Sequence, residues 1–319
     1  MIAWLLFQKI AELFLILASG FMLVKLKLLK SSDSRYLSLV LLYLINPCVL
    51  ITSFQLEISR ERLLAMLFSL GAAVLAHGIM ILLNLLLRRL LRLTRAEQAS
   101  CIYSNCVNLL IPVIGSVLGR EWVPFTSMYM VVMVSLTWSH GRMLLSGESG
   151  ISFRKIFGNL NIICIFIGLA LCLMQIRLPS LLAGAMESIG GMLGPVSMII
   201  TGMLIGGADL KRIIRMPGVW KVVCLRLLAY PIIILLIFKF SGLANLVPDG
   251  TGILLVSLLA AAAPSATVIV QMAQLYSDDG EYASAINVIA TLLCIVTNVI
   301  YQFDFLKYLS RHLKLQLEK

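Results

Sequence analysis

Residues 257–276 read SLLAAAAPSATVIVQMAQLY, an apolar stretch that Pro264 interrupts near its centre. The small residues 260–263 allow another helix to approach closely. Pro264 suits the first position of a new helical segment, where the N–H that proline lacks is not needed. The amides and hydroxyls of residues 265–267 would then be free at a helix N-terminus, which favours an anion. The stretch therefore predicts two helical segments separated by a break at Pro264.

A second apolar stretch, residues 104–119, reads SNCVNLLIPVIGSVLG and carries Pro112 near its middle. A mid-helix proline leaves the carbonyls just before it without partners, and in hydrocarbon these must be satisfied by protein or by a watery cavity. Asn105 and Asn108 lie one helical turn apart just ahead of the break, where they could fill that role or contact a substrate. For either stretch alone, a simple kink with interhelical hydrogen bonds is the alternative.

The composition indicates that the bilayer is the solvent of this chain. Of its 319 residues, 60% are hydrophobic and 13% charged, whereas a soluble domain has about 25% charged residues. Apolar runs long enough to cross about 30 Å of hydrocarbon recur along the chain. We expect an all-α integral membrane protein with ten transmembrane helices, at roughly residues 4–24, 36–55, 63–87, 98–118, 122–145, 158–176, 187–208, 218–240, 251–273 and 282–303.

The net charge of +11 comes mainly from Lys and Arg in short connections between these runs. Basic loops beside a span mark the cytoplasmic side of the membrane and are attracted to anionic lipids. No nucleic acid is therefore expected as a partner. The positive residues concentrate in the odd-numbered connections, which therefore face the cytoplasm. We expect a multi-pass protein of the cell inner (plasma) membrane with both termini extracytoplasmic. Residues 304–319 should form an amphipathic C-terminal tail, although its Lys and Arg disagree with that orientation.

The prolines suggest an internal repeat. Asn46-Pro47 and Pro112 are spaced along the chain much as Pro195 and Pro264 are. Residues 1–150 and 151–303 are therefore predicted to be two five-helix repeats, which an odd number of spans inserts with opposite orientation. In transporters with inverted repeats, interrupted helices near the midplane mark the binding site.

Nothing in the sequence points to a cofactor, a metal site or catalysis. The seven cysteines lie almost wholly in apolar runs and read as buried hydrophobes, the three histidines are scattered, and enzyme motifs are missing. Ionisable side chains inside spans have a functional alternative, and Glu12, His77 and Arg226 are the candidates. Glu12 is expected to pair with Lys9. We expect His77 to be a hydrogen-bonded core imidazole and Arg226 to extend to the cytoplasmic interface.

Several stretches resemble bacterial members of the auxin efflux carrier family, and the likeness covers about residues 13–303. They are NCVNLLIPVIGSVLG (105–119), GNLNIICIFIGLALCLMQIRLP (158–179), MLGPVSMIITGMLIGGADL (192–210), CLRLLAYPIIILL (224–236) and APSATVIVQMAQLYSDDGEYASAINVIATLLCIVT (263–297). The resemblance implies ten helices in two inverted five-helix repeats, whose fourth and ninth helices break and cross at prolines.

Individual residues match the family's motifs. Pro112 and Pro264 match the crossover prolines, and Asn105 matches the asparagine of the family's NxGxxGxP motif. The two glycines of that motif are replaced here by Val107 and Leu110. Similar proteins carry small organic acids, indole-3-acetate in plants and dicarboxylates such as malate in bacteria.

The leading hypothesis is a permease for a small organic anion that works by alternating access around the proline crossover. Pro112 and Pro264 would hold the broken backbone open, with Asn46, Pro47 and Pro195 in supporting positions. The expected substrate-binding residues are Asn105, Asn108, Ser265, Thr267 and Gln271.

Two alternatives stay open. One is a sodium- or proton-coupled symporter of the same fold, in which Asn, Ser and exposed carbonyls ligate Na⁺. The other is a membrane receptor or scaffold that binds a ligand without moving it. The expected partners are the substrate anion, membrane lipids and a second copy of the chain in a homodimer.

Overall fold

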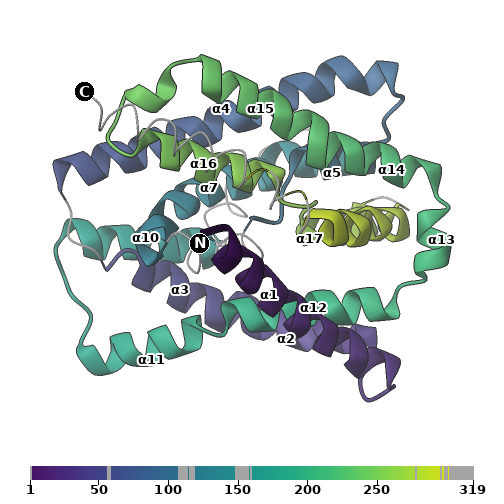
Figure 1. Ribbon diagram of the computed structural model, residues 1–319, viewed down its shortest axis with the longest axis horizontal. Coiled ribbons are helices and arrows are strands. Elements are labelled where there is room, and N and C mark those ends of the chain that lie inside the picture. Colours follow the sequence, from purple (N-terminus) through teal and green to yellow (C-terminus); the bar gives the residue numbers. More distant parts are fainter. Residues whose placement is uncertain are drawn as a thin grey trace.

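The computed structural model describes residues 2–55, 59–106, 114, 119–147, 158, 160–276, 279–294, 297 and 301. In these parts the chain is helical, apart from one isolated β-bridge between Ser104 and Ser265 (Figure 1). Helices long and apolar enough to cross a membrane are Ser31–Ser53, Arg60–Leu90, Ser180–Gly207 and Gly218–Phe240. Shorter apolar helices are Leu15–Lys25, Leu160–Leu173, Gly250–Ala262 and Gly280–Cys294. The predicted all-helical class with several membrane-capable helices is confirmed.

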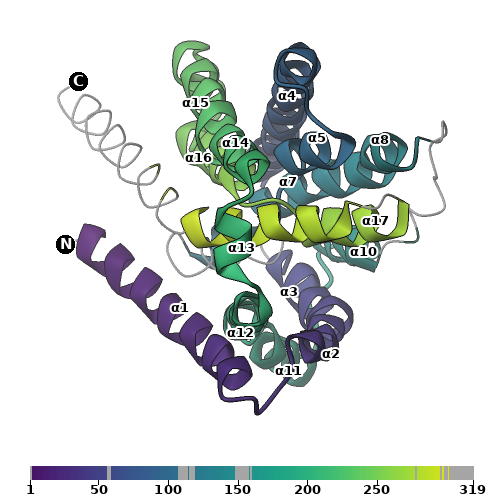
Figure 2. The same cartoon turned by 90° about the vertical axis from the view of Figure 1, so that its right-hand side faces the viewer.

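The helices pack in two groups, which lie one above the other in Figure 2. The lower one, the α12 group, contains α1 (Ile2–Lys25), α2 (Ser34–Val40), α3 (Asn46–Ser53), α10 (Leu160–Leu173), α11 (Ser180–Gly190) and α12 (Leu193–Gly207). The other, the crossover group, contains α4 (Arg60–Leu90), α5 (Arg95–Ile102), α7 (Val123–Leu136), α8 (Arg142–Ser146), α14 (Pro217–Cys224), α15 (Tyr230–Phe240), α16 (Gly250–Ala262), α17 (Thr267–Tyr276) and the helix Gly280–Cys294. Each group therefore draws helices from both halves of the chain.

Glycines bring α1 and α12 into close contact. A Cβ atom added to Gly202 would overlap the backbone carbonyl of Leu17, and one added to Gly20 would overlap that of Ile199. Small residues at a helix interface let two backbones approach, which is how helices associate where lipid removes the hydrophobic driving force. The α12 group is thus held together by backbone contact that larger side chains would prevent.

Two prolines inside long helices are preceded by π-helical turns. The turn Leu41–Ile45 comes just before Pro47, and the turn Leu225–Ala229 comes just before Pro231. A π turn shifts the hydrogen-bond ladder and rotates the side chains that follow, and such turns are frequent at functional sites. The second of these turns carries Arg226 into the interior of the crossover group.

Helices overlap every predicted apolar segment, but in two of the segments the helix stops at extended backbone. The segment at 98–118 is helical as α5 only to Ile102, and the segment at 251–273 is divided between α16 and α17. All seven cysteines are free and six are buried, as expected, whereas Cys224 is exposed on α14. The predicted tail at 304–319 lies outside the described residues.

Candidate functional site

Two helices of the crossover group end where they meet. α5 ends at Ile102, and the backbone of Tyr103 is extended (φ −96°, ψ 123°). α16 ends at Ala262, and the backbone of Ala263 is also extended (φ −63°, ψ 155°). Since α17 begins only at Thr267, the predicted break at Pro264 is observed.

The two extended segments, residues 103–105 and 263–266, pair in antiparallel fashion, and we refer to them together as the crossover. The Asn105 N–H donates to the carbonyl of Pro264 at 2.8 Å, and the Ala266 N–H donates to the carbonyl of Tyr103 at 3.0 Å. Ser104 lies opposite Ser265 in the bridge between them. This pairing satisfies backbone groups that broken helices would otherwise leave without partners in hydrocarbon.

A fully buried arginine binds carbonyls at the ends of both helices. The Arg226 Nε donates to the Ala263 carbonyl at 2.9 Å, and its Nη1 donates to the carbonyls of Cys101 at 2.9 Å and Ile102 at 3.3 Å. A helix C-terminus carries a partial negative charge, so the guanidinium lies between two such ends. The side chain is 0% exposed. The expectation that Arg226 extends to the cytoplasmic interface was therefore wrong.

Depth along the helix is the signal that identifies this arginine. Arg226 follows the start of the predicted segment at residue 218 by eight residues, which at 1.5 Å per residue is about 12 Å. A side chain that far inside a span needs a partner in the protein.

The predicted substrate-binding residues differ in where the structure places them. Ser265 is buried in the crossover, Asn105 and Thr267 are half-buried there and at the start of α17, and Gln271 is exposed on α17. Asn105 lies in extended backbone rather than on a helical face. Asn108 and Pro112 lie outside the described residues. The crossover thus brings together Asn105, Pro264, Ser265 and Thr267.

The supporting residues belong to the other group of helices. Asn46 and Pro47 begin α3, and Pro195 lies in the first turn of α12. A residue that sequence reasoning missed does contact the crossover: the Asn287 side-chain amide, from the helix Gly280–Cys294, donates to the carbonyl of Ser265. A polar residue in the middle of an apolar run could have been recognised as a candidate for such a role.

Some buried polar atoms at the crossover remain available. Within the part of the chain that the structure describes, the hydroxyl of Ser265 and the Nη2 of Arg226 have no hydrogen-bond partner. Neither residues 98–119 nor residues 250–276 contain an Asp or Glu, so the charge at the crossover is the positive charge of Arg226. Free donors, the N-terminus of α17 and this cation suit a small anion.

One buried carboxylate ties three helices together near the start of α5. Glu97 is 3% exposed and forms a capping box with Thr94. Its Oε1 lies 2.9 Å from the Nζ of Lys221 on α14 and accepts from the Tyr282 hydroxyl at 2.8 Å. Asn105 follows the end of α5, Arg226 follows the end of α14, and Asn287 lies on the helix Gly280–Cys294. Glu97 therefore helps to set the relative positions of these three residues.

Two histidines, His77 buried and His140 half-buried, have structural partners. The Nδ1 of His77 lies 2.8 Å from the carbonyl of Ala73, which confirms the expected core imidazole. His140, on the π-helical turn Thr137–Gly141, has its Nδ1 2.6 Å from the hydroxyl of Tyr103. That contact anchors the side chain of the first crossover residue.

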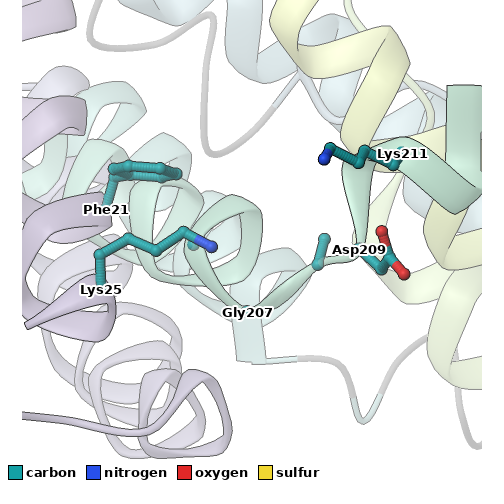
Figure 3. Close-up of a pocket in the computed structure, with 7 residues that line it drawn as sticks. Phe21, Lys25, Gly207, Asp209 and Lys211 are labelled. Carbon is teal, nitrogen blue, oxygen red and sulfur yellow. The ribbon is translucent and has the colours of Figure 1, made fainter. Parts of the chain in front are cut away.

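A hollow of about 450 Å³ lies away from the crossover, between the end of α1 and α13 (Leu210–Ile214). Lys25 and Lys211 extend their ammonium groups toward the space between them, and Asp209 and Phe21 complete part of the wall (Figure 3). Both lysines are exposed and a carboxylate accompanies them. We therefore place the candidate site at the crossover and not in this hollow.

Comparison with known proteins gives one match to a family and none to a curated protein. A family described as membrane transport protein matches the chain twice, over residues 5–152 and residues 149–302. No curated protein matches the chain.

Proposed function

Because the chain belongs to the membrane transport protein family, that of the auxin efflux carriers, and is a multi-pass membrane transporter, we propose that its cargo is a small organic anion. The observation that carries this proposal is the buried Arg226 at a crossover whose two segments lack acidic residues. Burying an unpaired cation is costly, and a carboxylate is the ligand that offsets its charge.

The binding residues in this proposal surround the crossover. The Asn105 amide, the Ser265 hydroxyl and the free N–H groups at the start of α17, with Thr267, bind the carboxylate of the substrate. Asn105 and Thr267 are half-buried, so part of each side chain is accessible to a ligand. Gln271 contributes from further along α17. The roles expected from the sequence for Asn108 in binding and for Pro112 at the break stay part of the proposal.

Alternating access in this proposal is a movement of one group of helices against the other. Among the described residues, packing is dense within the α12 group and within the crossover group, and the main contacts between the two groups are those of α7 with α3 and α10. The double family match, which divides the chain near residue 150, supports two five-helix repeats, which would be inverted. Rocking of such bundles around a fixed site is the usual mechanism for this architecture.

The proposal is tested by uptake of labelled mono- and dicarboxylates, malate among them, into vesicles that contain the purified protein. For Asn105→Ala we expect uptake of the transported acid to fall about tenfold or more, since a lost hydrogen bond to a charged group is worth roughly 1.5–3 kcal/mol. The backbone N–H that pairs with Pro264 is unchanged in this variant. Asn245→Ala, in an exposed turn, is the matched control and should transport like the wild type.

Equal flux in wild type and Asn105→Ala would defeat the assignment of Asn105 to the site. Tight binding of an acid, seen as a raised unfolding temperature, with no flux in vesicles would instead indicate a receptor.

A further inference from the structure

The carbonyl oxygens at the crossover form the kind of cluster that binds a coupling cation in other transporters. In those proteins, the carbonyl oxygens of unwound backbone and of half-helix C-terminal ends coordinate the coupling Na⁺ or H⁺ near the middle of the bilayer. Here the carbonyls of Cys101 and Ile102 end α5, and that of Ala263 follows the end of α16. These three oxygens converge on one point from two helices that belong to different halves of the chain.

The point where they converge is occupied by the guanidinium of Arg226, at 2.9, 3.3 and 2.9 Å from the oxygens of Cys101, Ile102 and Ala263. Met80 of α4 adds its Sδ at 3.4 Å from Nη1. We propose that Arg226 is a tethered cation, which means a positive charge fixed to the chain that takes the place of a coupling ion. This proposal rests on the function proposed above. The carrier then holds its positive charge permanently, and transport does not depend on Na⁺.

Two properties of the side chain suit it to this role. A guanidinium does not lose its proton in proteins, so its charge is fixed throughout the transport cycle. Its planar arrangement of donors spans several carbonyl oxygens at once, as a metal ion would. One edge, the Nη2, is buried and has no partner among the described residues, so it is free to bind a carboxylate oxygen of the cargo while Nε and Nη1 hold the helix ends.

The test is the unfolding temperature of the purified full-length protein in NaCl and in choline chloride at equal ionic strength. We expect the wild type to unfold at the same temperature in both salts. For Arg226→Ala we expect a fall of roughly 5 °C or more in choline chloride, since three carbonyls lose their donor. Added Na⁺ or low concentrations of ethylguanidinium should recover part of that fall, because either cation can enter the emptied position. The unfolding temperature of Arg226→Lys should fall less than that of Arg226→Ala, and neither Na⁺ nor ethylguanidinium should change it.

Arg212→Ala is the matched control, because Arg212 forms an exposed ion pair with Glu281 and its loss should create no response to either cation. A rise in the wild-type unfolding temperature specific to Na⁺ would overturn the proposal. The proposal would also be overturned if Arg226→Ala were as stable as the wild type, or if neither cation recovered any of its lost unfolding temperature. If Arg226→Ala does not fold, Arg226→Gln takes its place in the same comparison.

Uptake separates this proposal from the function on which it rests. Wild-type vesicles should take up the transported acid equally in NaCl and choline chloride. Uptake that requires Na⁺ overturns the tethered cation but keeps organic-anion transport. Absence of uptake of every acid counts against organic-anion transport, while the unfolding measurements still decide whether Arg226 occupies a cation position.

Discussion

Glu97→Gln is expected to lower the free energy of unfolding by about 2–3 kcal/mol. Glu97 is 3% exposed, and its carboxylate receives Lys221 and the Tyr282 hydroxyl from two other helices. Removing one partner of a fully buried ion pair costs about 3–5 kcal/mol because the other charge is left uncompensated. Since the side chain of Lys221 is 31% exposed, part of its charge can return to water and the loss is smaller. Thermal unfolding of the wild type and of Glu97→Gln in detergent measures this loss of stability.

A carboxylate in the neighbouring helix provides the control. Glu281 pairs with Arg212 at 2.9 Å, but their side chains are 70% and 63% exposed, and exposed pairs contribute about 0–1 kcal/mol. Glu281→Gln should therefore unfold within a degree or two of the wild type. If Glu97→Gln and Glu281→Gln lowered the unfolding temperature equally, Glu97 would not link α5 to α14. Adding Lys221→Met to Glu97→Gln should restore part of the loss by removing the unpaired cation.

Ala266→Pro is expected to abolish transport. Proline has no N–H, so the carbonyl of Tyr103 would lose the hydrogen bond that it accepts from Ala266. An orphaned buried carbonyl costs about 1–3 kcal/mol, and the crossover would lose one of its two backbone hydrogen bonds. Ser265 already lies in a β-bridge, a conformation that a residue before proline readily adopts. The effect therefore falls on the pairing itself, and vesicle uptake of the transported acid measures it.

Ala266→Gly keeps the N–H and is the control for that substitution. It should retain at least half of the wild-type uptake, since Ala266 contributes a single buried methyl group. Full activity of Ala266→Pro would mean that the bond between Ala266 and Tyr103 is not needed for transport.

The helices and one of the breaks could be predicted because their signals are local. An apolar run of sufficient length predicts a span, and a proline after four alanines marks a position where the helix can restart, as α17 does at Thr267. The same reasoning brought Asn105 and Ser265 forward as candidates. Both lie at the crossover.

The partners of the site could not be predicted because they come from distant parts of the chain. Arg226 contacts Cys101 and Ala263, residues that become neighbours only when α5, α16 and α14 pack. Its basic neighbours near the start of the segment favoured a place at the membrane surface, and the π-helical turn that rotates it inward has no simple sequence pattern. Asn105 was expected in a helical turn because local rules do not anticipate a strand-like pairing with residues 263–266.

The most direct test of a crossover in which two interrupted helices meet is a disulfide between Ser104→Cys and Ser265→Cys. Opposed residues of an antiparallel pair have Cα atoms about 4.5–5.5 Å apart, within the roughly 4.4–6.8 Å that a disulfide spans. After mild oxidation in the membrane, peptide mass spectrometry should find residues 104 and 265 joined. It should find no bond in a control that pairs Ser104→Cys with Gln271→Cys, at an exposed position of α17. Failure of 104 and 265 to join, or equal joining in the control, would contradict the crossover.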